Sequence, residues 1–279
     1  MSTQLWILES LKPHERSTGE ELRQFVLNRG DSFPGRISVE MTKPWSRSQF
    51  MDVLERMFQS ADEGNFPILH VEAHGGEDGL YLASGEMIEW DELSIPLIKI
   101  NRRLRGNLII TVAACWGGYM ARTTLSATRA PFLVVVGPET KIYDSHLIHD
   151  YSHFYYEFVG MRSLTKARWA LNAFKKANQT YFVSTASHCF TELMRSRLTN
   201  SRTAEENASR IEELVAKALA SDPDCDVESA REVAEAITLD TNRFLRIAWD
   251  LYVYADEYPK NKDLFPFPFE AELAPTRTL

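Results

Sequence analysis

The sequence predicts an α/β fold in which a mostly parallel sheet is flanked by helices, followed by an α-helical C-terminal extension. Over the first two thirds of the chain, short apolar runs alternate with segments of helical periodicity. From about Asp144 onward the helical pattern dominates. Strands buried on both faces form continuous apolar runs, which is typical of a parallel sheet covered by helices. We therefore expect an α/β domain over residues 1–199 and a helical extension with an extended tail over residues 200–279.

Each expected element has its own local signal. Apolar runs predict strands, apolar residues three and four positions apart predict helices, and Ser84-Gly85 predicts a hairpin turn between short strands at 80–82 and 87–89. The expected strands of the main sheet are 4–10, 36–42, 67–73, 107–114, 132–137 and, at an edge, 181–185. The expected helices are 18–29, 46–63, 91–103, 145–159, 165–177, 204–220 and 227–257. Catalytic groups in such sheets lie at the carboxyl ends of the strands.

Composition limits the functional classes. The chain has 279 residues, of which 44% are hydrophobic, and a formal charge of -8, so we expect a globular protein without general nucleic-acid binding. No apolar run reaches the roughly 18 residues of a membrane span, and the N-terminus has no secretory pattern. The cysteines, Cys115, Cys189 and Cys225, are too few and too widely spaced for a disulfide framework. We therefore expect a cytoplasmic protein with free thiols and no membrane partner.

Two of the apolar strands end in residues that can do chemistry. Residues 68–76 end in His74-Gly75-Gly76, and residues 108–118 end in Cys115-Trp116-Gly117-Gly118. A histidine can activate a thiol, and a helix beginning near Gly118 would favour the thiolate of Cys115. Each signal alone also fits a plain turn or a small buried side chain. Cys115 follows His74 by 41 residues, so the pair meets if the two strands are parallel neighbours. Together they predict a Cys-His dyad.

The residues around this dyad resemble the caspase-like (clan CD) cysteine peptidases. Residues 114–117, Ala-Cys-Trp-Gly, are similar to the Ala-Cys-x-Gly of the caspase nucleophile, and His74-Gly75 is similar to its upstream His-Gly. The part after the cysteine is more similar to the CHAT branch, which includes separase-like peptidases. That branch has an apolar strand, a loop with an Asp, an aromatic-rich helix, a Gly-x-Ser turn and a helix that opens with small residues. These features lie at 132–138, Asp144, 154–158, 160–163 and 166–168.

The resemblance implies a peptidase domain over residues 1–199 and a mechanism that needs no metal or cofactor. Cys115 would attack a peptide carbonyl, and His74 would protonate the leaving amine and then activate water. The backbone N–H groups of Gly75 and Cys115 would hold the oxyanion. The resemblance covers about residues 67–177.

The same resemblance names candidate substrate-binding residues. Asp144 and Glu139 lie on the loop expected beside the substrate, and Trp116 follows the nucleophile. An acidic pocket would select a substrate with Arg or Lys at P1, the residue before the cleaved bond. Ala113 stands where the family usually has Gln or Ser, a departure that affects substrate preference.

The expected partners follow from the resemblance as well. They are a protein substrate and an activating partner or small-molecule signal, as in a regulated effector of bacterial antiviral defence or cell death. One alternative is a catalytically silent caspase-like module that binds a partner or a signalling ligand. Another is a flavodoxin-like nucleotide-binding domain, which lacks support because no glycine-rich loop follows the first strand.

Two further groups of side chains have more than one interpretation. Glu72 lies two residues before His74, and would either orient the imidazole or serve as an ion-paired residue at the strand end. His146, His149 and His153 share a face of an expected helix, a spacing that metal sites also use. Because no carboxylate or cysteine pattern accompanies these three histidines, we predict no metal site.

Overall fold

The computed structural model describes residues 2–30, 33, 37–61, 65–124, 128–173, 180–198, 203–221 and 226–270. The chain divides into two compact units, Met1–Cys189 and Phe190–Leu279. The boundary expected from the sequence, between residues 199 and 200, lies outside the described residues and stays a prediction.

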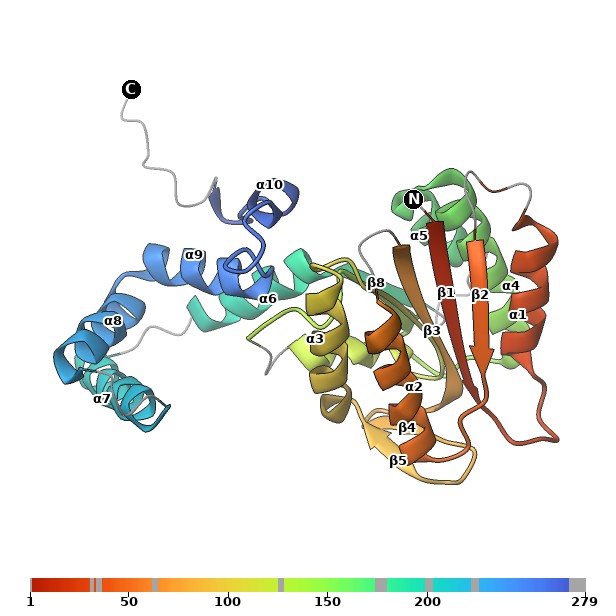
Figure 1. Cartoon of the computed structure of the whole chain (residues 1–279), viewed down its shortest axis with the longest axis horizontal. Helices are drawn as coiled ribbons and strands as arrows, with labels where there is room; N and C mark the ends of the chain where they lie inside the picture. Colours follow the sequence, from red (N-terminus) through yellow and green to blue (C-terminus); the bar gives the residue numbers. More distant parts are fainter. Residues whose placement is uncertain are drawn as a thin grey trace. The chain divides into compact units, whose positions relative to one another are not determined.

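The first unit is built on a sheet whose strands run in the order β2-β1-β3-β6-β7-β8 (Figure 1). The pairs β1–β2, β1–β3, β3–β6 and β6–β7 are parallel, and β8 is antiparallel to β7. The predicted fold class, a mostly parallel sheet flanked by helices, is confirmed. The strands are β1 Ser2–Ser10, β2 Ile37–Thr42, β3 Asn65–Gly75, β6 Ile109–Ala113, β7 Val134–Pro138 and β8 Tyr181–Thr185.

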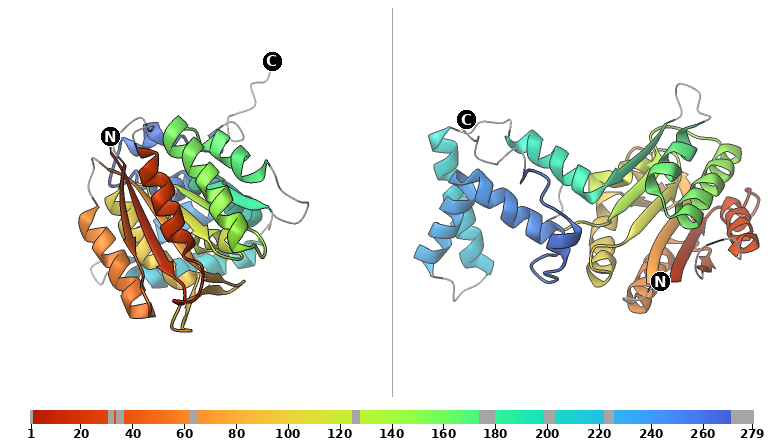
Figure 2. Two further views of the ribbon diagram at one scale, coloured as in Figure 1. Left: turned by 90° about the vertical axis from the view of Figure 1, so that its right-hand side faces the viewer. Right: turned by 90° about the horizontal axis from the view of Figure 1, so that it is seen from above.

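Successive side chains of the strands point to opposite faces of the sheet, and each face has its own hydrophobic core. Leu5 and Ile7 of β1 pack in the core with α1, α4 and α5, whereas Trp6 and Leu8 pack in the core with α2 and α3. Both layers of helices can be followed in Figures 1 and 2. Because both faces are covered, the inner strands are apolar along most of their length. The helices are α1 Thr18–Asn28, α2 Arg47–Ser60, α3 Ser94–Arg103, α4 Asp144–Tyr155 and α5 Leu164–Asn172.

Several elements of this unit differ in their ends from the sequence-based expectation. The expected helix 91–103 begins with a 3₁₀ turn, η2 Asp91–Leu93, before α3. The expected helix 145–159 ends as a π turn, η4 Tyr156–Gly160, directly after α4. The hairpin is present as β4 Gly79–Tyr81 and β5 Met87–Glu89, with Gly85 at φ 89° in its turn. This left-handed conformation is one that glycine adopts readily.

The second unit is helical. Its helices are α7 Ala204–Ser221, α8 Val227–Leu239, α9 Thr241–Tyr252 and α10 Asn261–Leu264, and α6 Ala186–Leu198 spans the division between the units. Ile211 and Val215 of α7 pack against Ala230 and Ala234 of α8. A second cluster is aromatic and joins Phe190, Trp249, Tyr252 and Phe269.

Two expectations for the C-terminal region are wrong. The single helix expected over 227–257 is interrupted at Asp240, whose carboxylate caps α9 by accepting a hydrogen bond from the Arg243 N–H over 3.0 Å. The expected extended tail, which holds Pro259 and Pro266, contains α10, and Phe269 is buried. Residues 271–279 of the expected tail lie outside the described residues. Among the helices of the described part, none combines the length and apolarity needed to cross a membrane.

Candidate active site

The two reactive side chains lie at the ends of neighbouring strands. β3 pairs with β6 in parallel, and the last pair in their register joins Glu72 to Ala113. His74 and Cys115 each follow that pair by two residues, so they stand at the same level of the sheet. His74 also pairs with Tyr81 of β4 and therefore belongs to β3, whereas the sequence placed it just past the strand. The hairpin extends the strand because it supplies a further partner for the backbone.

The backbone at Gly75 runs directly against that of the cysteine. A Cβ atom at Gly75 would lie 2.0 Å from the carbonyl oxygen of Cys115 and 3.0 Å from the Cβ of Ala114. Any residue with a Cβ would force the two strand ends apart, so glycine is required by the close approach. The oxyanion roles of the Gly75 and Cys115 N–H groups stay predictions.

The thiol of Cys115 is held by the loop that follows β7. The Ile142 N–H donates to Sγ over 3.5 Å, and Sγ lies 3.7 Å from the Ile142 carbonyl oxygen. The Trp116 N–H donates to the Thr140 carbonyl oxygen over 3.3 Å. Trp116 has φ 54°, a left-handed conformation that bulky residues rarely adopt. A 3₁₀ helix, η3 Gly117–Thr124, follows where the sequence predicted a helix to begin.

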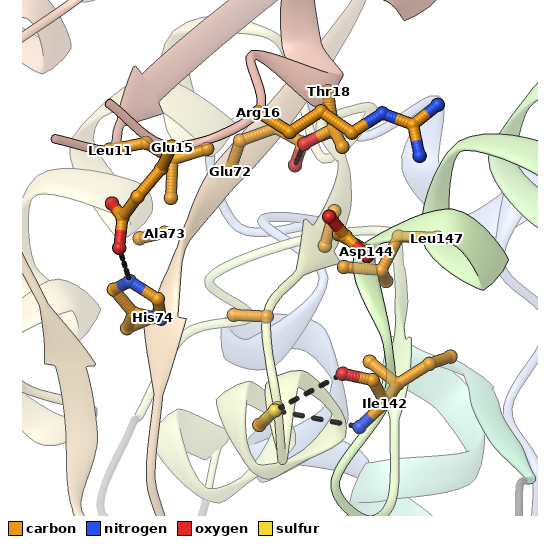
Figure 3. Close-up of a pocket in the computed structure, with 13 residues that line it drawn as sticks. Leu11, Glu15, Arg16, Thr18, Glu72, Ala73, His74, Ile142, Asp144 and Leu147 are labelled. Atoms are coloured by element: carbon orange, nitrogen blue, oxygen red, sulfur yellow. Dashed lines mark hydrogen bonds and ion pairs between the residues drawn. The ribbon is translucent and has the colours of Figure 1, made fainter. Parts of the chain in front are cut away.

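The imidazole of His74 has a carboxylate partner that the sequence did not suggest. Its Nε2 lies 2.8 Å from Oε1 of Glu15, which belongs to the loop between β1 and α1 (Figure 3). The His74 side chain is 59% exposed and that of Glu15 is 25% exposed. Burial alone raises the pKa of Glu15, but hydrogen bonds from the Lys12 N–H and from His74 outweigh it, so the pKa is lowered. Glu15 is 59 residues away from His74 in the chain, and no local pattern links the two.

Glu72, the alternative orienting residue, belongs to a buried network. Its carboxylate accepts from Nε2 of His70 over 2.9 Å and from the Thr18 hydroxyl over 2.6 Å. On the other side of the ring, Nδ1 lies 2.6 Å from Thr111 Oγ1, which lies 2.7 Å from the Tyr155 hydroxyl. A carboxylate only accepts, so Nε2 of His70 carries the proton. Of the two interpretations of Glu72, the paired strand-end residue is the one that the structure shows.

A pocket of about 320 Å³ is lined by three of the candidate residues, His74, Cys115 and Asp144 (Figure 3). Three carboxylates, those of Glu15, Glu72 and Asp144, line it, and so does Arg16. The guanidinium of Arg16 is engaged by Glu21 through two contacts of 2.6 and 2.7 Å. The full lining is Leu11, Glu15, Arg16, Thr18, Glu72, Ala73, His74, Ala113, Ala114, Cys115, Ile142, Asp144 and Leu147.

Two of the three candidate substrate-binding residues lie outside this lining. Glu139 is exposed and bound to Thr180, whose hydroxyl donates to its carboxylate. Trp116 is half-buried, and its ring centroid lies 5.7 Å from Nζ of Lys141. Asp144 does line the pocket, at the start of α4.

The remaining histidines and cysteines offer little for other chemistry. Over the residues that the structure describes, no group of three or more His, Cys, Asp or Glu side chains is close enough to hold a metal ion. His149 and His153 are neighbours on α4, with ring centroids 4.6 Å apart. Burial raises the pKa of the Cys189 thiol, which makes it a poor nucleophile. Cys225 lies outside the described residues.

Comparison with known proteins gives only distant likenesses. No protein-family model and no curated protein matches the sequence. Among solved structures, the Drosophila initiator caspase Dronc aligns over 66% of this chain and 79% of its own, with 12% identity and a TM-score of 0.49. Protein GSU0716 from Geobacter sulfurreducens aligns over 66% of this chain and 92% of its own, with 12% identity and a TM-score of 0.42. At these values neither likeness carries an argument about activity.

Proposed function

We propose that this chain is a caspase-like cysteine endopeptidase that cleaves protein substrates through Cys115 and His74. The observation that carries the proposal is the register of β3 and β6, which sets both residues at one level on the wall of one pocket. A thiol and an imidazole at such a position are the groups that nucleophilic acyl transfer requires. The motifs at 74–75 and 114–117 support the same activity.

In the proposed reaction, the Cys115 thiolate adds to the carbonyl carbon of the scissile peptide bond. The C–N bond then breaks as the His74 imidazolium protonates the leaving amine, and a thioester remains. Neutral His74 next takes a proton from water, and the hydroxide adds to the thioester and releases the new carboxyl group and the thiolate. The N–H groups of Gly75 and Cys115 stabilise the oxyanion in both steps.

The sharpest test replaces each member of the dyad. We expect Cys115→Ala and His74→Ala to lower peptide cleavage by roughly 10³-fold or more, since each removes a group that acts in bond breaking. The matched control is Cys189→Ala, which changes a thiol of low expected reactivity and should keep wild-type turnover. Urea unfolding of each variant checks that the fold survives. Wild-type cleavage by either dyad variant would refute the assignment.

The lining of the pocket supports a basic residue at P1 of the substrate. The exposed carboxylate of Asp144 lines the same pocket as Cys115, whereas the guanidinium of Arg16 is engaged by Glu21. A lysine or arginine side chain would find acceptors there and an aspartate would meet like charge. We expect Asp144→Asn to lower kcat/KM for an Arg substrate by about 10-fold, with little change for an alanine substrate. Glu139→Gln is the control on the same loop, because Glu139 is outside the pocket lining.

The alternative is a catalytically silent module that binds a partner or a signalling ligand. The contacts of Cys115 with the Ile142 backbone favour it, because they hold the sulfur on the loop after β7. A peptide carrying a thiol-reactive group separates the two functions. Stable labelling of Cys115, lost in His74→Ala, supports the peptidase, and its absence under all activating conditions supports the silent module.

The same contacts support regulation by a partner or a small-molecule signal. A substrate carbonyl must reach the sulfur, so loop 139–145 has to move away from Cys115 before cleavage. Such a switch suits an effector of bacterial defence or cell death, the role that the motif resemblance suggests. We expect the isolated chain to cleave peptides slowly and to be stimulated by an activator. Full activity of the isolated chain, unchanged by cell extract or second messengers, would refute this part of the proposal.

A further inference from the structure

Glu15 reaches His74 from a loop whose own geometry fixes the carboxylate. The Glu15 N–H donates to the Lys12 carbonyl oxygen over 2.9 Å, which closes a turn with Pro13 at its second position. Proline suits this position because its φ is already set for such a turn. The Lys12 N–H donates back to Oε2 of Glu15 over 2.6 Å, which leaves Oε1 for Nε2 of His74 at 2.8 Å.

The arginine next to Glu15 in the chain is bound to another carboxylate. Arg16 follows Glu15 in the chain, yet its guanidinium is bound to Glu21 through two hydrogen bonds. The carboxylate of Glu15 therefore keeps one oxygen on its own turn and the other on the imidazole. The hydrogen bond from the Lys12 N–H fixes the carboxylate, and the hydrogen bond to His74, 59 residues away in the chain, fixes the position of Nε2.

We propose that Glu15 is a positioning residue of the active site, which holds His74 with the proton on Nε2 and leaves Nδ1 for proton transfer. A carboxylate accepts hydrogen bonds and cannot donate them, so the ring nitrogen facing it must carry hydrogen. In neutral histidine the other nitrogen then has the free lone pair. This inference rests on the proposed peptidase function for the role of Nδ1, whereas the contact and the tautomer can be tested without any substrate.

The kinetic test replaces the acceptor in two ways. Glu15→Gln keeps an oxygen acceptor but removes the charge, and we expect kcat to fall about 10-fold with KM within about 3-fold. Glu15→Lys puts a donor where the acceptor stood, and we expect a larger fall of kcat, on the order of 10²- to 10⁴-fold, as for a wrongly protonated triad histidine. Glu20→Gln and Glu20→Lys are the matched controls, since Glu20 lies on α1 with Arg23 and Gln24 as its partners.

A second measurement reads the ring nitrogens directly. Long-range ¹H–¹⁵N correlation spectra of histidine-labelled protein, near pH 8 where imidazoles are largely neutral, report which nitrogen is protonated. We expect His74 to be protonated on Nε2 in the wild type and in both Glu20 variants. We expect the Nδ1-protonated form to gain population in Glu15→Lys, because an ammonium next to Nε2 requires an acceptor there.

The two readouts separate failure of the inference from failure of the proposed function. If cleavage depends on Cys115 and His74 but both Glu15 variants turn over like wild type, the positioning role is wrong and the peptidase stands. If no peptidase activity exists but the His74 tautomer responds to Glu15→Lys, the positioning contact stands and the peptidase proposal fails. A His74 tautomer that is the same in the wild type and in Glu15→Lys overturns the inference in either case.

Discussion

Replacing Gly75 with alanine tests the junction between the two strand ends most directly. The new Cβ would lie 2.0 Å from the Cys115 carbonyl oxygen, whereas Cβ atoms in proteins almost never come closer than 3.0 Å to another heavy atom. The obstacle is backbone, so it cannot rotate away as a side chain would. The strand ends must separate, and overpacking of this kind costs about 1 to 3 kcal/mol. Since about 1 kcal/mol shifts the melting temperature by roughly 2–4 °C in a domain of 150–250 residues, we expect a decrease of roughly 2 to 12 °C.

The assay measures both the stability of the fold and the rate at which Cys115 is alkylated. Thermal and urea unfolding of Gly75→Ala should show the loss of stability, and timed alkylation with iodoacetamide should show a changed rate at Cys115, because its peptide has moved. Gly30→Ala is the matched control: a Cβ there meets only Ile37 Cγ2, at an ordinary 3.9 Å, among the described residues. That variant should be neutral or stabilised by about 0.4–1 kcal/mol, through reduced entropy of the unfolded chain. Equal melting temperatures for the two variants would refute the close approach.

Three further predictions concern stability and the reactivity of the thiols. His70→Leu leaves the buried carboxylate of Glu72 without one partner and should cost about 3–5 kcal/mol in urea unfolding, part of which a second change, Glu72→Leu, recovers. Hydrogen bonds from a neighbouring lysine and arginine on α7 lower the pKa of Glu213 from 4.5 to about 2. The stabilisation by the ionised carboxylate is therefore complete above pH 4.5 and is lost as the pH falls toward 2. In Glu213→Gln, the midpoint of urea unfolding should decline less over this pH range than in the wild type. Peptide mapping after brief alkylation should find Cys115 labelled before Cys189, whose pKa is raised by burial.

Sequence reasoning succeeded where a local pattern carries the information. The apolar runs around Ile68 and Ile110 predict buried parallel strands because a core on both faces requires apolar residues at successive positions. The same runs point to the place where His74 and Cys115 stand, since strand ends of a parallel sheet meet at one edge.

It failed where the information is spread over distant parts of the chain. Nothing near residue 74 indicates that Glu15, rather than Glu72, contacts the imidazole, because that contact depends on how the loop after β1 crosses the sheet edge. Glu139 lies outside the pocket lining for a similar reason: its carboxylate accepts a hydrogen bond from Thr180, a residue that the pairing of β8 with β7 brings alongside. The cap at Asp240 is different. An Asp directly before a helical segment is a local N-cap signal, but the continuous helical pattern over residues 227–257 concealed it.

The register of β3 and β6 has a consequence for how this chain tolerates change. The spacing between His74 and Cys115 is set by the parallel pairing of β3 with β6, although the two residues are 41 positions apart in the chain. Within the segment that joins them, the turn between β4 and β5 takes no part in this pairing, and lengthening a flexible turn costs only about 0.6 kcal/mol for each doubling. Gly85 lies at the hairpin tip, and a Cβ added there would have no described atom within 4 Å, so it is the natural place for an inserted peptide tag. A reporter fused there would travel with the site while leaving its two reactive groups in place.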